Sequence, residues 1–277
     1  MDLVFSDIHA DIDALESILE IASSGDFIKK YGNFSRIINL GDVLERGSHP
    51  KQVLDKLQYL KKNYPVVSVI GNHDEAFLYN KLIGSNSIES MNAHEKLNKE
   101  DIASFKQNKD GTFGQQLFLD KKNGILCVHG GPLDPQKVTP KNAHDESWLY
   151  QRSWQRLSPE DFEFFSYAGY HYKPSSAFSE AKNNQSHVIL CGHQHTETAL
   201  MQDGHIHEIY PSLVPTQEKT AKHILEKREI EINSSCDYLI RLGLGGPSGA
   251  YGGGYENPHF GIVQYDPKKV LLFTVKH

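Results

Sequence analysis

Short apolar runs recur along roughly the first 200 residues, and each run ends in polar side chains. The five clearest runs end at Phe5, Leu40, Ile70, Val128 and Leu190. Runs of this kind, with little alternation of apolar and polar residues, are typical of strands buried on both faces. The pattern therefore predicts five buried strands whose carboxyl ends carry polar residues.

Apolar residues at helical spacing fill the gaps between the first three runs. Residues 11–21 and residues from about 48 to 62 each carry one apolar face. This alternation of strands and helices implies parallel strands joined by right-handed crossovers. A capping box with proline at Ser158-Pro159-Glu160-Asp161 predicts a further helix. Later strands, which we expect to complete a second sheet packed on the first, are predicted at 205–210, 229–233, 237–242, 261–265 and 270–275.

The segment at about 76–120 differs in composition, being rich in Asn, Lys, Ser and Glu. It is expected to form amphipathic helices, among them 76–83 and 100–107. Because it leaves one strand end and returns to the next strand, we expect a helical cap insert over a site at the strand ends. A solvated insertion without a role in substrate binding is the alternative. A site built from so many strands cannot be divided between domains, so we expect one domain over residues 1–277.

Composition and charge limit the partners. The net charge of -6 and the absence of a polybasic run argue against bulk nucleic acid, but they are compatible with a small anionic substrate. No signal peptide, transmembrane helix or membrane partner is expected, since no apolar run approaches 18 residues. Cys127 and Cys191 lie inside apolar runs, which favours reduced thiols and a cytoplasmic location. The oligomeric state is not determined by the sequence.

The polar residues at the strand ends are of the types that bind divalent metals. A set rich in imidazole suits Mn, Fe, Co, Ni or Zn better than Mg or Ca. Two ions roughly 3.5 to 4 Å apart hold phosphate oxygens and generate a hydroxide for in-line attack. Residues i and i+2 of an extended strand point the same way, so Asp-x-His and His-x-His can each serve one ion. Seven candidates exceed the need of one ion and fit two ions that share a carboxylate: Asp7, His9, Asp42, Asn72, His129, His193 and His195.

Three further features have less specific interpretations. His205-Ile206-His207 has the spacing of the metal motif but follows no apolar run, so a surface hairpin is expected. The glycine-rich stretch at 243–254 precedes no helix pattern, which favours a mobile loop bordering the site over a phosphate cradle. The aromatic stretches 167–172 and 251–255 are compatible with stacking on a nucleotide base, although aromatic residues usually serve the core.

The order of the motifs resembles the calcineurin-like metallophosphoesterase superfamily, over about the first 200 residues. The motifs are Asp7-x-His9, Gly41-Asp42-x-x-x-Arg46-Gly47, Gly71-Asn72-His73-Asp74, His129-Gly130-Gly131 and Gly192-His193-x-His195. The resemblance implies an α/β fold, in which a β-sandwich of two mixed sheets is flanked by helices in four layers (αββα).

The same resemblance implies a role for each site residue. One ion is held by Asp7, His9, Asp42 and His195, and the other by Asp42, Asn72, His129 and His193. Asp42 bridges the two ions. His73, hydrogen-bonded to Asp74, is implied as the proton donor to the leaving oxygen, and Arg46 as a phosphate contact.

The sequence therefore predicts a dinuclear metal-dependent phosphoester hydrolase, either a phosphatase or a phosphodiesterase, that acts on a small phosphorylated substrate such as a nucleotide. The motifs Gly-Asp-x-x-x-Arg-Gly and His-Gly-Gly resemble the branch of protein phosphatases and diadenosine tetraphosphatases. Glu45 stands where that branch has aspartate and Asp74 where it has glutamate, and the final His-x-His is shared with simple phosphodiesterases. A diadenosine-polyphosphate hydrolase or protein phosphatase, and a catalytically silent metal-binding scaffold, are the alternatives.

Overall fold

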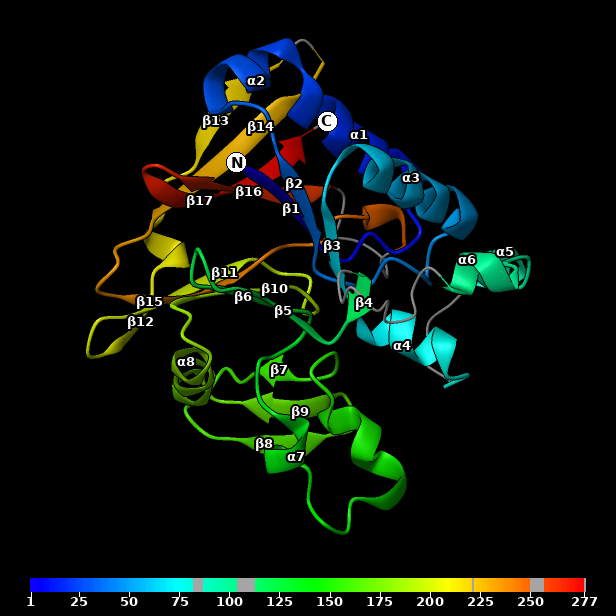
Figure 1. Ribbon diagram of the computed structural model, residues 1–277, viewed down its shortest axis with the longest axis vertical. Coiled ribbons are helices and arrows are strands. Elements are labelled where there is room, and N and C mark those ends of the chain that lie inside the picture. Colours follow the sequence, from blue (N-terminus) through cyan, green and yellow to red (C-terminus); the bar gives the residue numbers. More distant parts are fainter. Residues whose placement is uncertain (82–86, 104–112, 221, 250–256, 277) are drawn as a thin grey trace.

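Two mixed sheets pack face to face in the computed structural model, which describes residues 1–81, 87–103, 113–220, 222–249 and 257–276 (Figure 1). In spatial order, the first sheet contains β13 (Thr216–Lys219), β14 (Ile224–Glu231), β17 (Lys268–Lys276), β16 (His259–Tyr265), β1 (Asp2–Phe5), β2 (Arg36–Asn39), β3 (Val66–Val69) and β4 (Phe113–Gln115). The second contains β12 (Ile206–Glu208), β11 (Thr198–Gln202), β15 (Asp237–Arg241), β10 (Val188–Cys191), β6 (Ile125–Val128) and β5 (Leu117–Asp120).

The five predicted buried strands are β1, β2, β3, β6 and β10. In the first sheet β1, β2 and β3 are parallel neighbours, with Leu3 opposite Ile37 and Ile38 opposite Val67. In the second sheet β10 is parallel to β6, with Leu190 opposite Cys127. Parallel strands bring their carboxyl ends to one edge of a sheet, so each sheet presents its polar strand ends as a group.

Helices cover the outer faces of both sheets. α1 (Ile12–Ser23), α2 (Gly25–Tyr31) and α3 (Pro50–Asn63) pack on the first sheet through one apolar cluster that includes Leu15 and Leu57. α8 (Pro174–Asn183) packs on the second sheet through Phe178. A separate apolar cluster lies between the sheets. Short helical elements elsewhere are α7 (Pro135–Val138), η1 (His144–Tyr150), η2 (Tyr210–Ser212) and η3 (Pro247–Gly249). The predicted fold of two mixed sheets flanked by helices is confirmed.

A small third sheet was not predicted. It has the order β7 (Arg156–Leu157), β9 (Gly169–Tyr172) and β8 (Phe164–Ser166), and it lies below the second sheet in Figure 1. The helix predicted to begin at Ser158 is wrong. The Ser158 N–H donates to the Tyr172 carbonyl and its hydroxyl accepts from Glu160 N–H, so the capping residue instead closes a turn that leads into β8.

The insert between β3 and β6 combines helices with strands. Its first helix, expected at 76–83, is α4 (Asn72–Leu78), and α5 (Ile88–His94) and α6 (Lys99–Ala103) follow. Residues 104–107 of the expected second helix lie outside the described part, and the insert ends in the strands β4 and β5. The His94 ring accepts the Glu45 N–H at 2.7 Å, which fixes α5 beside the loop after β2. The role of the insert as a cap stays a prediction.

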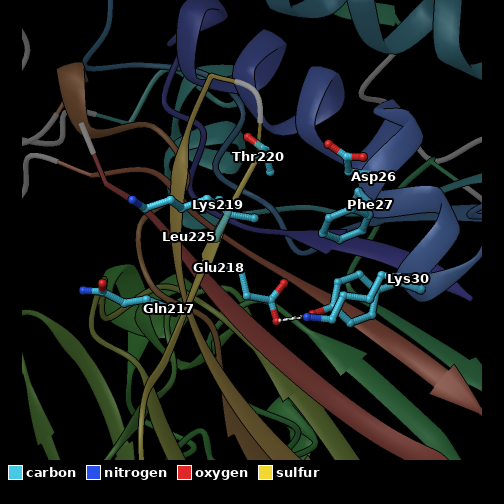
Figure 2. A pocket seen from close by; sticks show the side chains of 9 residues that line it. Asp26, Phe27, Lys30, Gln217, Glu218, Lys219, Thr220 and Leu225 are labelled. Atoms are coloured by element: carbon cyan, nitrogen blue, oxygen red, sulfur yellow. Dashed lines mark hydrogen bonds and ion pairs between the residues drawn. The ribbon is translucent and has the colours of Figure 1, made fainter.

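A pocket of about 230 Å³ lies between α2 and the β13-β14 edge of the first sheet (Figure 2). Glu218 in its wall accepts hydrogen bonds from Lys30 and Tyr31, so its charge is already compensated. The pocket contains none of the predicted site residues. Cys127 and Cys191 are buried and free, as expected. Within the described ranges no helix is both long and apolar enough to cross a membrane.

Candidate metal centre

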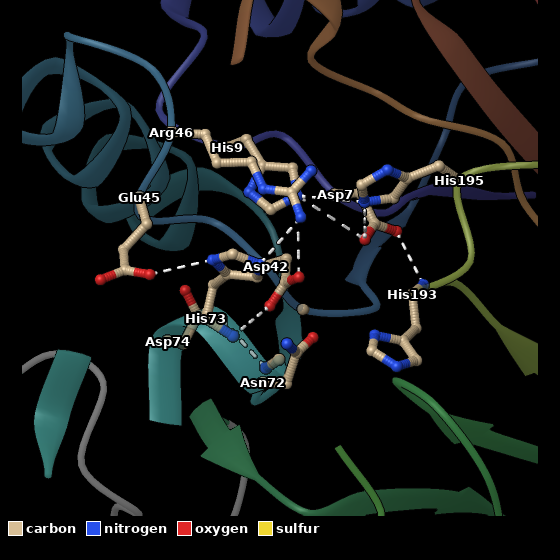
Figure 3. A network of polar contacts seen from close by, with 12 residues as sticks. Asp7, His9, Asp42, Glu45, Arg46, Asn72, His73, Asp74, His193 and His195 are labelled. Atoms are coloured by element: carbon tan, nitrogen blue, oxygen red, sulfur yellow. Dashed lines mark hydrogen bonds and ion pairs between the residues drawn. The ribbon is translucent and has the colours of Figure 1, made fainter. Parts of the chain in front are cut away.

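The loops after the five buried strands converge, and they bring all seven predicted metal-binding side chains together (Figure 3). Two sets of three side chains each have donor atoms within 4.8 Å of one another. Asp7, His9 and His195 form the first set, and Asp42, His129 and His193 form the second. The same grouping was implied by the family resemblance.

Asp42 lies between the two sets. Its Oδ2 atom is 3.7 Å from His9 Nε2 and 3.3 Å from His129 Nε2. The side-chain oxygen of Asn72 lies 3.1 Å from the same nitrogen of His129, which adds the seventh residue to the second set. One carboxylate is thus placed where two neighbouring ions can share it.

The physical reason given for the Asp-x-His and His-x-His spacings was wrong. β1 ends at Phe5 and β10 ends at Cys191, so neither motif is extended. Asp7, His9, His193 and His195 instead have positive φ angles of 55°, 47°, 71° and 61°. Such angles are uncommon outside glycine and collect at functional sites. Because the backbone turns there, His193 and His195 point into different sets rather than toward one ion.

Close backbone contacts hold these turns in place. A Cβ atom on Gly192 would lie 1.8 Å from Ser6 Oγ, so only glycine lets the loops after β10 and β1 approach each other. The next residue, His193, donates its N–H to Asp7 Oδ2 at 3.0 Å. The two loops therefore position each other.

The described part of the glycine-rich stretch supports the same loop. Gly245 N–H donates to the Ser6 carbonyl and Gly246 N–H to the Asp7 carbonyl, each at 2.9 Å. Ser248 N–H donates to the Asp11 carboxylate at 2.9 Å. These N–H groups are already used, so they do not cradle a phosphate. Residues 250–256, which include the second aromatic stretch, lie outside the described ranges.

The donor atoms fit divalent cations. Asp7 Oδ1, Asp42 Oδ2 and His193 Nε2 are buried and have no hydrogen-bond partner in the part of the chain that the structure describes. Burial favours the uncharged acid at Asp7, but the His195 ring, whose Nε2 lies 3.4 Å from Asp7 Oδ1, and the charge of His129 outweigh it and lower the pKa of Asp7 to about 2. Burial also lowers the pKa of His9 and His193 well below the usual value. Charged carboxylates and neutral imidazoles are the forms that bind metals.

His73 is held by a different carboxylate from the one expected. Its Nδ1 atom lies 2.9 Å from Glu45 Oε2, and its Nε2 atom lies 3.0 Å from Arg46 Nη2. The predicted hydrogen bond to Asp74 is wrong, because both Asp74 oxygens accept backbone N–H groups instead. The donors are Val43, Leu44 and Gly71. Asp74 therefore shapes the loop after β2, while Glu45 orients His73.

A family model described as calcineurin-like phosphoesterase matches residues 3–197. The chain belongs to this family. The phosphoesterase is accordingly a phosphoester hydrolase of a metal-dependent family, and the recognition of the superfamily is confirmed.

Solved structures share the fold of this phosphoesterase. A metallophosphoesterase from Sphaerobacter thermophilus is 20% identical with a TM-score of 0.64, over 100% of this chain and 88% of that chain. A hypothetical protein from Pyrococcus horikoshii OT3 is 15% identical with a TM-score of 0.59, over 100% and 89% respectively. Likeness at such identities shows the fold alone. No curated protein matches the chain.

Gln194, which separates the two histidines of the last motif, links three parts of the phosphoesterase. Its side-chain oxygen accepts the Leu157 N–H at 2.8 Å and a hydrogen bond from Arg241 at 2.7 Å. Its amide nitrogen donates to the Leu157 carbonyl at 3.3 Å. Gln194 therefore attaches β7 to the loop that carries His193 and His195. The sequence pattern marked it only as the variable position of the motif.

The attachment of β7 through Leu157 brings the preceding residue, Arg156, close to the loop that carries His193 and His195. Arg156 Nε donates to the Ala168 carbonyl at 2.7 Å, and its terminal amino groups have no hydrogen-bond partner among the described residues. Burial lowers its pKa, while the nearby charges of Asp42 and Asp7 raise it. Arg156 was not predicted from the sequence, because it belongs to no motif and lies in a strand that was itself not predicted.

Proposed function

We propose that this phosphoesterase is a dinuclear metal-dependent hydrolase, in which two divalent ions share Asp42. The observation that carries the proposal is the position of Asp42 between two sets of donors, with its Oδ2 atom buried and without a hydrogen-bond partner in the described chain. The ring nitrogens of His9 and His129 that lie near this oxygen are themselves candidate ligands, and a bound cation would offset the cost of burying the carboxylate.

Asp7, His9, Asp42 and His195 would hold one ion, and Asp42, Asn72, His129 and His193 the other. An imidazole-rich donor set favours Mn, Fe, Co, Ni or Zn. When bound, two such ions supply Lewis acidity that holds phosphate oxygens and lowers the pKa of a water at the site. The residues of the chain provide the remaining chemistry.

His73 is suited to donate a proton to the leaving oxygen. Its Nδ1 atom faces the Glu45 carboxylate, which favours a proton on that nitrogen and fixes the ring. Nε2 accepts from Arg46 in this structure, and once Arg46 turns to the phosphate, Nε2 is the nitrogen left to exchange a proton with a substrate. Arg46 lies against His73, and the charges of Arg46 and Arg156 act on each other. We propose that both guanidinium groups contact the phosphate, because their planar forks match its oxygens.

The substrate proposed is a small phosphorylated molecule. Two arginines beside the metal centre favour a substrate with more negative charge, which a phosphomonoester or an oligophosphate carries and a simple diester lacks. The positive charge of the two arginines is local. It therefore suits a small anion, whereas the net charge of -6 on the whole chain disfavours a bulk polyanion such as nucleic acid.

The test is turnover by protein that has been stripped of metal and reloaded with Mn, Fe, Co, Ni, Zn or Mg in turn. The substrates are p-nitrophenyl phosphate and bis-p-nitrophenyl phosphate. We expect hydrolysis with one or more of the imidazole-preferring metals and a higher kcat/KM for the monoester. Absence of turnover with every metal would contradict the proposal and favour the metal-binding scaffold. Preference for the diester would contradict the role given to the two arginines.

A further inference from the structure

One face of the three-stranded sheet carries a row of side chains that begins next to the metal centre, at the residue before Leu157. Arg156 in β7 is opposite His171 in β9, and His171 is opposite Phe164 in β8. Residues that are opposite in register project from the same face of a sheet. The neighbours Leu157 and Tyr172 project from the other face, which packs into the apolar core beneath the second sheet.

The members of the row that follow Arg156 carry aromatic rings. The rings of Phe164 and His171 stack with centroids 4.1 Å apart and planes 13° apart. Phe162 extends the row, with its ring centroid 5.4 Å from that of Phe164 and 54% of the residue exposed. His171, Phe164 and Arg156 are themselves only partly buried. The row therefore leaves aromatic surface open to solvent outside the apolar core, where a ligand ring can contact it.

The two ends of the row differ in charge. Arg156 precedes Leu157, whose N–H donates to Gln194 between His193 and His195, so this cationic end of the row lies next to the metal centre. The aromatic end begins at His171, one strand spacing away, and reaches Phe164 at two spacings, which is about 10 Å. Burial and the charge of Arg156 lower the pKa of His171, so the imidazole is neutral at pH 7 and the aromatic end carries no positive charge. The row therefore offers a cation for a phosphate and, further out, a neutral surface for a flat ring.

We propose that this row, defined as Arg156, His171, Phe164 and Phe162, binds a nucleoside phosphoester, with the phosphate at Arg156 and the base against His171 and Phe164. The inference rests on the proposed function for the position of the phosphate. The rings of His171 and Phe164 are stacked on each other, so a flat base that lies across their edges makes edge-to-face contacts with both, which is a favoured aromatic geometry. The sugar then spans the interval between the metal centre and the rings.

The experiment compares two competitive inhibitors of aryl phosphoester hydrolysis, adenosine 5′-monophosphate and ribose 5-phosphate. They share the phosphoester and the sugar and differ by the base. We expect adenosine monophosphate to bind about tenfold tighter, because its base adds edge-to-face contacts with two aromatic rings. The Phe164→Ala substitution should remove most of this ratio and leave the inhibition constant of ribose 5-phosphate unchanged, which also shows that the protein is folded.

Tyr167→Ala is the matched control. Tyr167 lies in the same hairpin and is 84% exposed, but its ring contacts Phe165, which stacks on Tyr150 away from the row. This variant should keep the wild-type ratio. Phe164→Leu, which retains apolar volume without a ring, should behave like Phe164→Ala.

Equal inhibition by the two ligands would overturn the inference, as would a ratio that survives Phe164→Ala. Phenyl phosphate that binds as tightly as adenosine monophosphate would also overturn it, because the row would then accept any aryl group. If no aryl phosphoester is hydrolysed with any metal, the proposed function has failed separately. The two ligands are then stable, and titration calorimetry with wild-type and Phe164→Ala protein decides the inference on its own.

Discussion

The metal centre and the three-stranded sheet lie side by side but are built in different ways. At the metal centre the side chains are almost fully buried, and strained backbone turns are fixed by hydrogen bonds between loops. The sheet β7-β9-β8 leaves aromatic rings partly exposed, and the Gln194 side chain attaches it to the centre. The difference suggests a division of labour. In the function proposed above, the buried region would supply reactivity and the exposed region selectivity.

The largest effect should come from Asp42→Asn. It keeps the shape of the side chain but removes the charge that two ions would share, so turnover should fall by more than about a hundredfold, the upper end for residues one step removed from a metal. Turnover and bound metal are measured together, with circular dichroism as the control for folding. Normal activity in this variant would remove the assignment of reactivity to the buried region.

A smaller but more selective effect is expected for Glu45→Gln. His73→Ala should cost about 10²- to 10⁴-fold on alkyl phosphoesters and less on p-nitrophenyl esters, whose leaving group needs little protonation. Glu45→Gln should show the same dependence on the leaving group at about a tenth of the size or less, because the ring is still held by a hydrogen bond. Equal losses on both substrate types would mean that Glu45 and His73 do not act in proton donation.

The link between the two regions can be cut at Gln194. Gln194→Ala leaves the buried Leu157 N–H and one Arg241 donor without their acceptor, so the free energy of unfolding should fall by about 1–3 kcal/mol in urea denaturation. Gln194→Glu retains that acceptor oxygen and should lose less. If both variants were as stable as the wild type, the sheet would be held by other contacts.

The smallest effect concerns the pH dependence of the free energy of unfolding that His94, which holds the loop after β2, contributes. Burial lowers the pKa of His94, although the hydrogen bond to the Ser90 carbonyl and the charge of Glu45 oppose this. The unfolded chain therefore takes up this proton first, and the free energy of unfolding should decrease as pH falls below about 6.5 toward the lower folded pKa. Above that range the group contributes no pH dependence. His94→Gln should reduce the slope between about pH 7 and pH 5, whereas an unchanged slope would contradict the effect of burial.

The two regions also differ in how far the sequence predicts them. Residues such as Asp7, His129 and His195 follow buried strands, and an apolar run that ends in a metal-binding residue is visible without a structure. The backbone turns that separate His193 from His195 were not predictable, because a positive φ at a histidine leaves no mark in the pattern. The partner of His73 was misassigned for a similar reason. Asp74 is adjacent in sequence, but the helix turn directs its carboxylate to backbone N–H groups.

The three-stranded sheet was missed because its strands are short and its turn resembles a helix start. The rules for a capping box are satisfied by Ser158-Pro159-Glu160-Asp161. In the structure, however, the Ser158 N–H donates to the Tyr172 carbonyl of β9, and no helix begins there. A tertiary contact thus overrides a local preference. The aromatic stretch 167–172 was divided between the core and the open face by strand alternation, which becomes visible only when the register is known.

The central claim is that two ions share Asp42, and anomalous diffraction from crystals grown with manganese or zinc tests it most directly. The account predicts two anomalous peaks on either side of Asp42 in the wild-type protein, one among Asp7, His9 and His195 and the other among Asn72, His129 and His193. A single peak in the fully loaded protein, or two peaks that are both remote from Asp42, would contradict it.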